Sequence, residues 1–130
     1  MPVADTTTLV AILDETHPRH AEAGSKLQGV ATLHVPTVIL SELSLVLRRL
    51  AKNQRHDGNR YARRVVTALM AKPEVHECQQ HDGAQARQLY VANPKLSYAD
   101  SVAIATAWGL PDDLVTFDDD QFEVWKSGAP

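Results

Sequence analysis

The chain has 130 residues, of which 44% are hydrophobic and 22% charged, and its formal net charge is −3. This size suits one domain with a single hydrophobic core, and its one cysteine cannot form an internal disulfide. The sequence has neither an apolar run near the roughly 20 residues of a membrane span nor the basic and apolar start of a signal peptide, so we expect residues 1–130 to form one cytoplasmic domain.

The first half of the chain alternates short strands with helices. In chain order, the patterns predict a strand over residues 3–4, helices over 9–13 and 19–28, a strand over 30–35 and a helix over 38–52. Gly29 closes the second helix, and Thr37 caps the third after the break at Pro36. Strands joined through helices are typical of a parallel sheet.

The second half continues this alternation. We expect a turn over 54–59, a helix over 60–71, a weak strand over 75–78, helices over 81–91 and 96–109, a buried strand over 114–117 and a short final strand or packing segment over 122–125. The whole pattern predicts an α/β domain with a central, mainly parallel sheet flanked by helices.

Four carboxylates stand where this topology gathers functional residues. Asp5 and Asp118 come directly after predicted strands, whereas Glu42 and Asp100 lie near the beginnings of helices that follow loops. Binding sites in open parallel sheets form beyond the carboxyl ends of the strands, at a topological switch point. We therefore expect the four side chains to meet at one end of the sheet.

Such a cluster needs neutralising charge. Two unit charges about 4 Å apart repel by roughly 4 kcal/mol at an effective dielectric constant of 20, and oxygen ligands without Cys or His select Mg²⁺ or Mn²⁺. One ion would activate a water for in-line attack on a phosphodiester, and a second could stabilise the leaving oxygen. Thr6 and Thr116 offer hydroxyls that can hold the carboxylates or bound waters.

Two of these acids also have structural explanations. Ser97 and Asp100 have the spacing of a capping box, in which each side chain bonds the other residue's backbone N–H. Glu42 lies among apolar neighbours at helical spacing, where an ion pair with an arginine would account for it.

Four segments of the chain resemble the acidic motifs of PIN-domain ribonucleases. They are Val3-Ala4-Asp5-Thr6-Thr7, Val35-Pro36 through Ser41-Glu42-Leu43, Tyr98-Ala99-Asp100-Ser101-Val102-Ala103-Ile104-Ala105, and Leu114-Val115-Thr116-Phe117-Asp118. Their order and spacing match across nearly the whole chain. Among PIN-domain proteins, the single-domain size is most similar to the VapC-type toxins of toxin–antitoxin pairs.

This resemblance implies a metal-dependent endoribonuclease that uses Mg²⁺ or Mn²⁺. The metal-binding and catalytic acids would be Asp5, Glu42, Asp100 and Asp118. The resemblance further implies an RNA substrate, a cognate antitoxin and a homodimer. Two alternatives stay open: a PIN fold that binds RNA or a partner without cleaving, and a PIN nuclease of RNA processing.

The chain departs from the family pattern at two places. Thr7 stands where the family often has Asn or Ser, and a hydroxyl can replace part of that hydrogen bonding. The last motif has one extra residue before Phe122, so Asp120 is a candidate supporting or alternative ligand, and we expect Asp119 to be a solvated loop charge.

Positive charge is concentrated in the middle of the chain. Seven of the thirteen Lys and Arg residues form what we call the basic arm: Arg48, Arg49, Lys52, Arg55, Arg60, Arg63 and Arg64. Only Asp57 opposes them in this window. Such a patch on an acidic protein favours contact with RNA phosphates or with a partner protein, whereas a solvated helical hairpin whose cations suit the helix dipole is the structural alternative.

Overall fold

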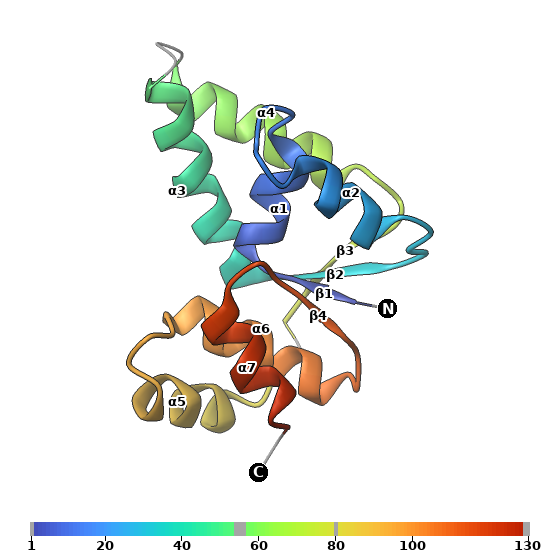
Figure 1. Ribbon diagram of the computed structural model, residues 1–130. Coiled ribbons are helices and arrows are strands. Elements are labelled where there is room, and N and C mark those ends of the chain that lie inside the picture. Colours follow the sequence, from blue (N-terminus) through green and yellow to red (C-terminus); the bar gives the residue numbers. More distant parts are fainter. Residues whose placement is uncertain (1, 54–56, 80, 129–130) are drawn as a thin grey trace.

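The computed structural model describes residues 2–53, 57–79 and 81–128 (Figure 1). In chain order the elements are β1 (Val3–Ala4), α1 (Thr6–Leu13), α2 (His20–Leu27), β2 (Leu33–Pro36), α3 (Thr37–Asn53), α4 (Gly58–Met70), β3 (Val75–Cys78), α5 (Gly83–Ala92), α6 (Tyr98–Gly109), β4 (Leu114–Val115) and α7 (Asp119–Lys126). The predicted α/β class is confirmed. None of the described helices is both long and apolar enough to cross a membrane.

The four strands form one sheet in the order β3-β2-β1-β4, and every neighbouring pair is parallel. Val3 of β1 is in register with His34 on one side and with Leu114 on the other. The chain builds outward from β1 to β2 and β3, and then returns to place β4 on the opposite side of β1. The junction between β1 and β4 is therefore the topological switch point of the sheet.

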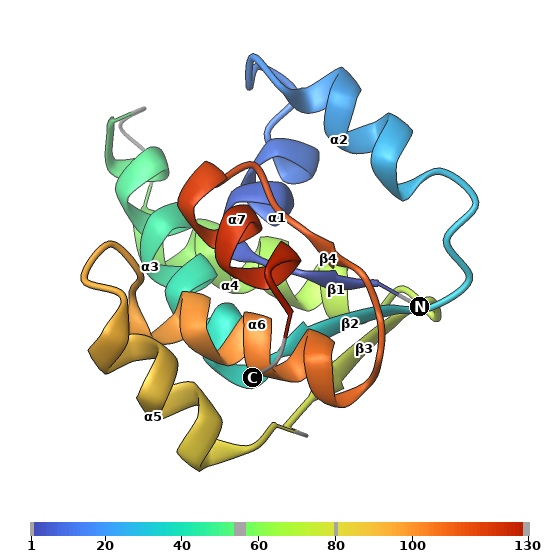
Figure 2. The same cartoon turned by 60° about the horizontal axis from the view of Figure 1, so that its bottom comes forward.

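Helices cover both faces of this sheet. Figure 1 places α1, α2 and α4 on one side and α5, α6 and α7 on the other, and Figure 2 shows the second group from the front. Helix α6 contacts β1, β2 and β4, and its residues 99 and 101–107 are buried. Small residues allow this close packing, and the two buried hydroxyls of Ser101 and Thr106 bond backward to carbonyl oxygens of the same chain segment.

The last element differs from the sequence prediction. Residues 122–125 belong to helix α7, not to a strand, because the Asp118 carboxylate accepts from the Gln121 N–H at 3.0 Å and caps a helix that starts at Asp119. The preceding strand is also shorter than predicted and ends at Val115. Part of the predicted turn over 54–59, namely residues 54–56, lies outside the described residues.

Helices α3 and α4 form an antiparallel hairpin with a close contact at its tip. Gly58 begins α4, and a Cβ at this position would lie 2.8 Å from the carbonyl oxygen of Arg48 on α3. A side chain at residue 58 would therefore push the two helices apart.

The substitution Gly58→Ala should lower the free energy of unfolding by about 1–3 kcal/mol, the usual effect of overpacking. The measurement is the urea midpoint of unfolding. Gly109→Ala is the matched control, because Gly109 also lies in a helix and no atom lies within 4 Å of the added Cβ. That control should be neutral or stabilising by up to about 1 kcal/mol, since Ala favours helix more than Gly does. Equal midpoints for Gly58→Ala and wild type would contradict the close contact.

Candidate active site

Three of the four predicted acids lie around the switch point at the beginnings of helices. Asp5 follows β1 and caps α1, Asp118 follows β4 and caps α7, and Asp100 lies in the first turn of α6. Glu42 comes from α3, which directly follows β2. The N-termini of three helices thus lie beside three carboxylates, and the positive end of a helix dipole attracts negative charge.

Asp5 is the most enclosed of these acids. Its side chain is 1% exposed, and its carboxylate accepts hydrogen bonds from the Thr8 N–H at 3.0 Å, from the Thr7 hydroxyl at 2.9 Å and from the Thr116 hydroxyl at 2.5 Å. Burial raises the pKa of Asp5 above its ordinary value, and the hydrogen bonds from Thr116, Thr8 and Thr7 oppose this shift. The carboxylate is therefore fixed in one orientation.

The hydroxyls of Thr7 and Thr116 join Asp5 to the segment that follows β4. While donating to Asp5, the Thr7 oxygen accepts from the Phe117 N–H at 3.0 Å, and the Thr116 oxygen accepts from the Asp118 N–H at 3.0 Å. Any displacement of this segment must therefore strain the hydrogen bonds of Asp5.

The two threonines predicted to support the carboxylates have different surroundings. Thr116 bonds Asp5, as described. The Thr6 hydroxyl is buried and has no hydrogen-bond partner in the part of the chain that the structure describes. Thr7 provides the second hydroxyl contact instead, at the position where the family pattern often has Asn or Ser.

Asp100 has the structural role that its sequence context suggested. Its Oδ2 accepts from the Ser97 N–H at 2.9 Å while the Ser97 hydroxyl accepts from the Asp100 N–H, which completes a capping box. Burial raises the pKa of Asp100, the hydrogen bonds with Ser97 oppose the shift, and the charges of Glu42 and Asp118 raise it further. Glu42 and Asp118 are therefore each close enough to repel Asp100.

Gln121 is a site residue that the sequence analysis missed. It is fully buried, its side-chain amide donates to Asp100 Oδ1 at 2.8 Å, and its backbone N–H donates to Asp118 Oδ1 at 3.0 Å. One residue thus ties two acids from different helices together. The available signal was local: Asp118 and Gln121 have the three-residue spacing of a helix cap.

The other two acids of the last motif lie on the protein surface. Asp119 and Asp120 are exposed, and the Asp120 carboxylate lies 3.8 Å from the Lys95 ammonium. In the structure Asp120 pairs with this lysine and makes no hydrogen bond to the other acids. Asp119 is the solvated charge that the sequence predicted.

Glu42 is half-buried and makes no hydrogen bond or ion pair with a described residue, so the arginine partner suggested for it is absent from the described part of the chain. Its side chain lines a cavity of about 480 Å³. The other lining residues are Thr6, Thr7, Val10, His17, Arg19, Val46 and Phe117. Glu42 is therefore a free carboxylate beside an open space at the site.

The donor set fits a hard divalent cation, because it consists of carboxylate and hydroxyl oxygens. The mutual repulsion that raises the pKa of Asp100 is also what a cation would relieve. Within residues 2–53, 57–79 and 81–128, however, no group of three or more His, Cys, Asp or Glu side chains is arranged closely enough to hold an ion. The site thus has the oxygen donors that a divalent cation prefers, but its described side chains are not arranged as a complete set of ligands.

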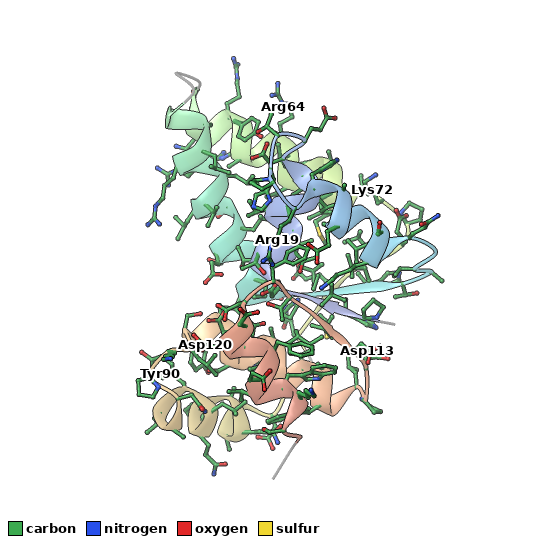
Figure 3. All side chains as sticks on the ribbon, in the orientation of Figure 1. Arg19, Arg64, Lys72, Tyr90, Asp113 and Asp120 are labelled. Atoms are coloured by element: carbon green, nitrogen blue, oxygen red, sulfur yellow. The ribbon has the colours of Figure 1, made fainter. Side chains whose placement is uncertain are left out.

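The described arginines of the basic arm lie on the hairpin of α3 and α4, and all are exposed: Arg48, Arg49, Arg60, Arg63 and Arg64. Arg64 lies on α4, in the upper part of Figure 3, with its guanidinium 5.9 Å from the Tyr61 ring. Arg55 and the side chain of Lys52 lie outside the described residues. These five cations therefore all lie on the hairpin of α3 and α4.

Comparison with solved structures finds the same fold. Mycobacterium tuberculosis VapC20, described as a sarcin–ricin loop cleaving toxin, matches with a TM-score of 0.73 and 17% identity, over 95% of each chain. PAE2754 from Pyrobaculum aerophilum matches with a TM-score of 0.69 and 18% identity, over 98% of this chain and 81% of that one. No curated protein sequence matches significantly.

The family model described as PIN domain matches residues 3–126, which include all four acids and every strand of the sheet. Together with the parallel sheet and the acids at its switch point, this match shows that the chain belongs to the PIN domain family.

Proposed function

We propose that this PIN domain is an endoribonuclease that hydrolyses RNA phosphodiester bonds with Mg²⁺ or Mn²⁺, as the toxin of a toxin–antitoxin pair. The observation that carries the proposal is the linked set of acids at the switch point. Asp5, Asp100 and Asp118 are joined through Thr116 and Gln121, and the free carboxylate of Glu42 interacts with Asp100.

In this mechanism Asp5, Glu42, Asp100 and Asp118 would hold the divalent ion, which would supply an activated water and polarise the phosphate. The hydroxyl and amide partners keep the carboxylates in place before the substrate arrives. Asp5 has a fixed orientation because its hydrogen bonds define both oxygens. Glu42 is free to complete the ligand set, because no described hydrogen bond holds it elsewhere.

The basic arm supports an RNA substrate. Its exposed arginines begin about 9 Å along α3 from Glu42, at 1.5 Å per residue, and exposed cations at this distance suit phosphates flanking the cleaved bond.

A cytoplasmic location, a cognate antitoxin and a homodimer belong to the same proposal through the resemblance to VapC-type toxins. The fold likeness to VapC20 supports this proposal.

A binding protein without cleavage is the competing function. The lack of a closed ligand set in the described residues favours it, whereas the hydrogen bonds that hold three acids together favour catalysis. Activity measurements on acid variants separate these two functions.

Each of four substitutions should slow RNA cleavage at least ~100-fold, since a metal ion contributes several kcal/mol to stabilising the transition state. The four are Asp5→Asn, Glu42→Gln, Asp100→Asn and Asp118→Asn. Cleavage of a fluorophore-quencher RNA in Mg²⁺ measures this. Asp119→Asn is the matched control, because it neutralises an exposed acid of the same segment and should keep full activity. Equal cleavage by wild type in EDTA and in Mg²⁺ would contradict the proposal.

Charge repulsion at the site predicts a metal-dependent effect on stability. In EDTA near neutral pH, Glu42→Gln should raise the free energy of unfolding by about 0.3–1 kcal/mol, because it removes a charge that repels Asp100. In Mg²⁺ wild type should become the more stable protein, because the ion binds its folded state more tightly. Urea unfolding in the two buffers measures both effects.

The pH dependence of this difference has a defined sign. The pKa of Asp100 is raised in the folded state, so its contribution to stability is fully present below the unfolded pKa and is lost as pH rises through the folded pKa. The advantage of Glu42→Gln in EDTA should therefore shrink as the solution is acidified and Asp100 becomes protonated. An advantage that grows on acidification would contradict the repulsion.

Gln121→Leu should weaken Mn²⁺ binding by about 10- to 100-fold, because residues that orient metal ligands contribute effects of this size. Leucine keeps the buried volume and removes only the bond to Asp100, while the backbone cap at Asp118 remains. Isothermal titration with Mn²⁺ measures the affinity, and Gln88→Leu, an exposed glutamine on α5, is the control. Unchanged affinity in Gln121→Leu would assign Gln121 to folding alone.

A further inference from the structure

Two cations outside the basic arm are held over one aromatic ring beside the acids. The Arg19 guanidinium lies 5.0 Å from the centroid of the Phe117 ring, and the Lys26 ammonium lies 4.7 Å from it. Both distances are within the range of a cation–π interaction. In Figure 3 Arg19 lies near the middle of the molecule.

Phe117 is fixed to the acid site through its backbone. It directly precedes Asp118, and its N–H donates to the Thr7 hydroxyl at 3.0 Å. The same hydroxyl donates to Asp5. The position of the ring is therefore coupled to two of the proposed metal ligands.

The cations come from opposite ends of α2. Arg19 is the residue before its first turn and Lys26 lies in its last turn. A spacing of seven residues places both on one side of a helix, about 10 Å apart along its axis. Ala23 is the only buried residue of α2, so this helix projects from α1 and directs its charged side toward Phe117.

No ion pair joins Arg19 or Lys26 to an acid within the described ranges, although Glu22 lies between them on α2. Arg19 and Phe117 also line the 480 Å³ cavity that Glu42 borders. One side of this cavity thus carries the Glu42 carboxylate, and another carries the Arg19 guanidinium and the Phe117 ring. An anionic group that enters the cavity is repelled by Glu42 and attracted by Arg19.

We propose that Arg19 and Lys26, positioned by Phe117, form a clamp that binds one RNA phosphate adjacent to the bond cut at the acids. This inference rests on the proposed endoribonuclease function and names a subsite for its substrate. Both cations are exposed beside the ring, and a guanidinium binds phosphate oxygens in a bidentate manner. The clamp and the basic arm lie on different helices, so the RNA backbone contacts the protein at two separate places.

The test uses the double variant Arg19→Ala/Lys26→Ala and a fluorescent, short single-stranded RNA of random sequence, in EDTA to prevent cleavage. The Kd from anisotropy should rise about fivefold at ~0.1 M salt, and the slope of log K against log salt should fall by about 0.7, the value for one phosphate contact on a single strand. In Mg²⁺ the KM for cleavage should rise similarly while kcat changes less than about twofold, because the clamp binds and does not react.

The matched control is Arg87→Ala/Lys126→Ala. Arg87 is exposed on α5, and Lys126 lies 5.9 Å from the ring of Phe122, which makes it another lysine over a phenylalanine. This control should leave Kd, slope and KM unchanged. Phe117→Leu keeps both cations and removes only the ring, and it should raise Kd about two- to fivefold, whereas Phe122→Leu should not.

The outcomes separate the clamp from the proposed function. If wild type cuts RNA and the double variant keeps its Kd, slope and KM, the clamp is wrong and the nuclease stands. If wild type binds RNA without cutting it and the double variant binds more weakly, the clamp stands and the nuclease fails. If wild type neither binds nor cuts RNA, both fail. An unchanged Kd with a shift from dimer to monomer in light scattering would overturn the clamp and assign the two cations to an interface between copies.

Discussion

The hydrogen bonding of one buried carboxylate organises the end of the sheet at which the candidate acids lie. Asp5 is almost without exposure, and a buried carboxylate is stable only when its oxygens are hydrogen-bonded or paired with a cation. Its donors come from the first turn of α1 and from Thr116 after β4. These bonds form only when β1, β4 and α1 are all correctly placed relative to one another. The fold and the site therefore depend on the same few bonds.

The acids of the site also serve the architecture. Asp5 and Asp118 cap α1 and α7, and Asp100 completes the capping box of α6. Helix N-termini supply unpaired N–H groups and the positive end of a dipole, which lets several carboxylates gather at one place. Glu42 is the exception, because it caps nothing. Its position beside the open cavity suits a group that responds to an ion or a substrate.

Opposite charges at this end of the molecule are arranged on different elements. The acids belong to the switch point, the basic arm to the hairpin of α3 and α4, and the pair Arg19 and Lys26 to α2. Cations grouped in this way give a protein with a net charge of −3 local regions that attract polyanions.

The sequence alone determined the α/β class, most of the elements and the family resemblance, and it predicted the four candidate acids, because periodicity, strand ends and caps are local signals. It could not place Gln121 against Asp100 or Arg19 against Phe117, since these contacts join residues far apart in the chain. It also treated residues 122–125 as a strand or packing segment, where the cap from Asp118 makes a helix. Only the tertiary structure decided that Asp120 pairs with Lys95 and that Thr7 rather than Thr6 bonds Asp5, because a side chain's partner depends on which elements pack around it.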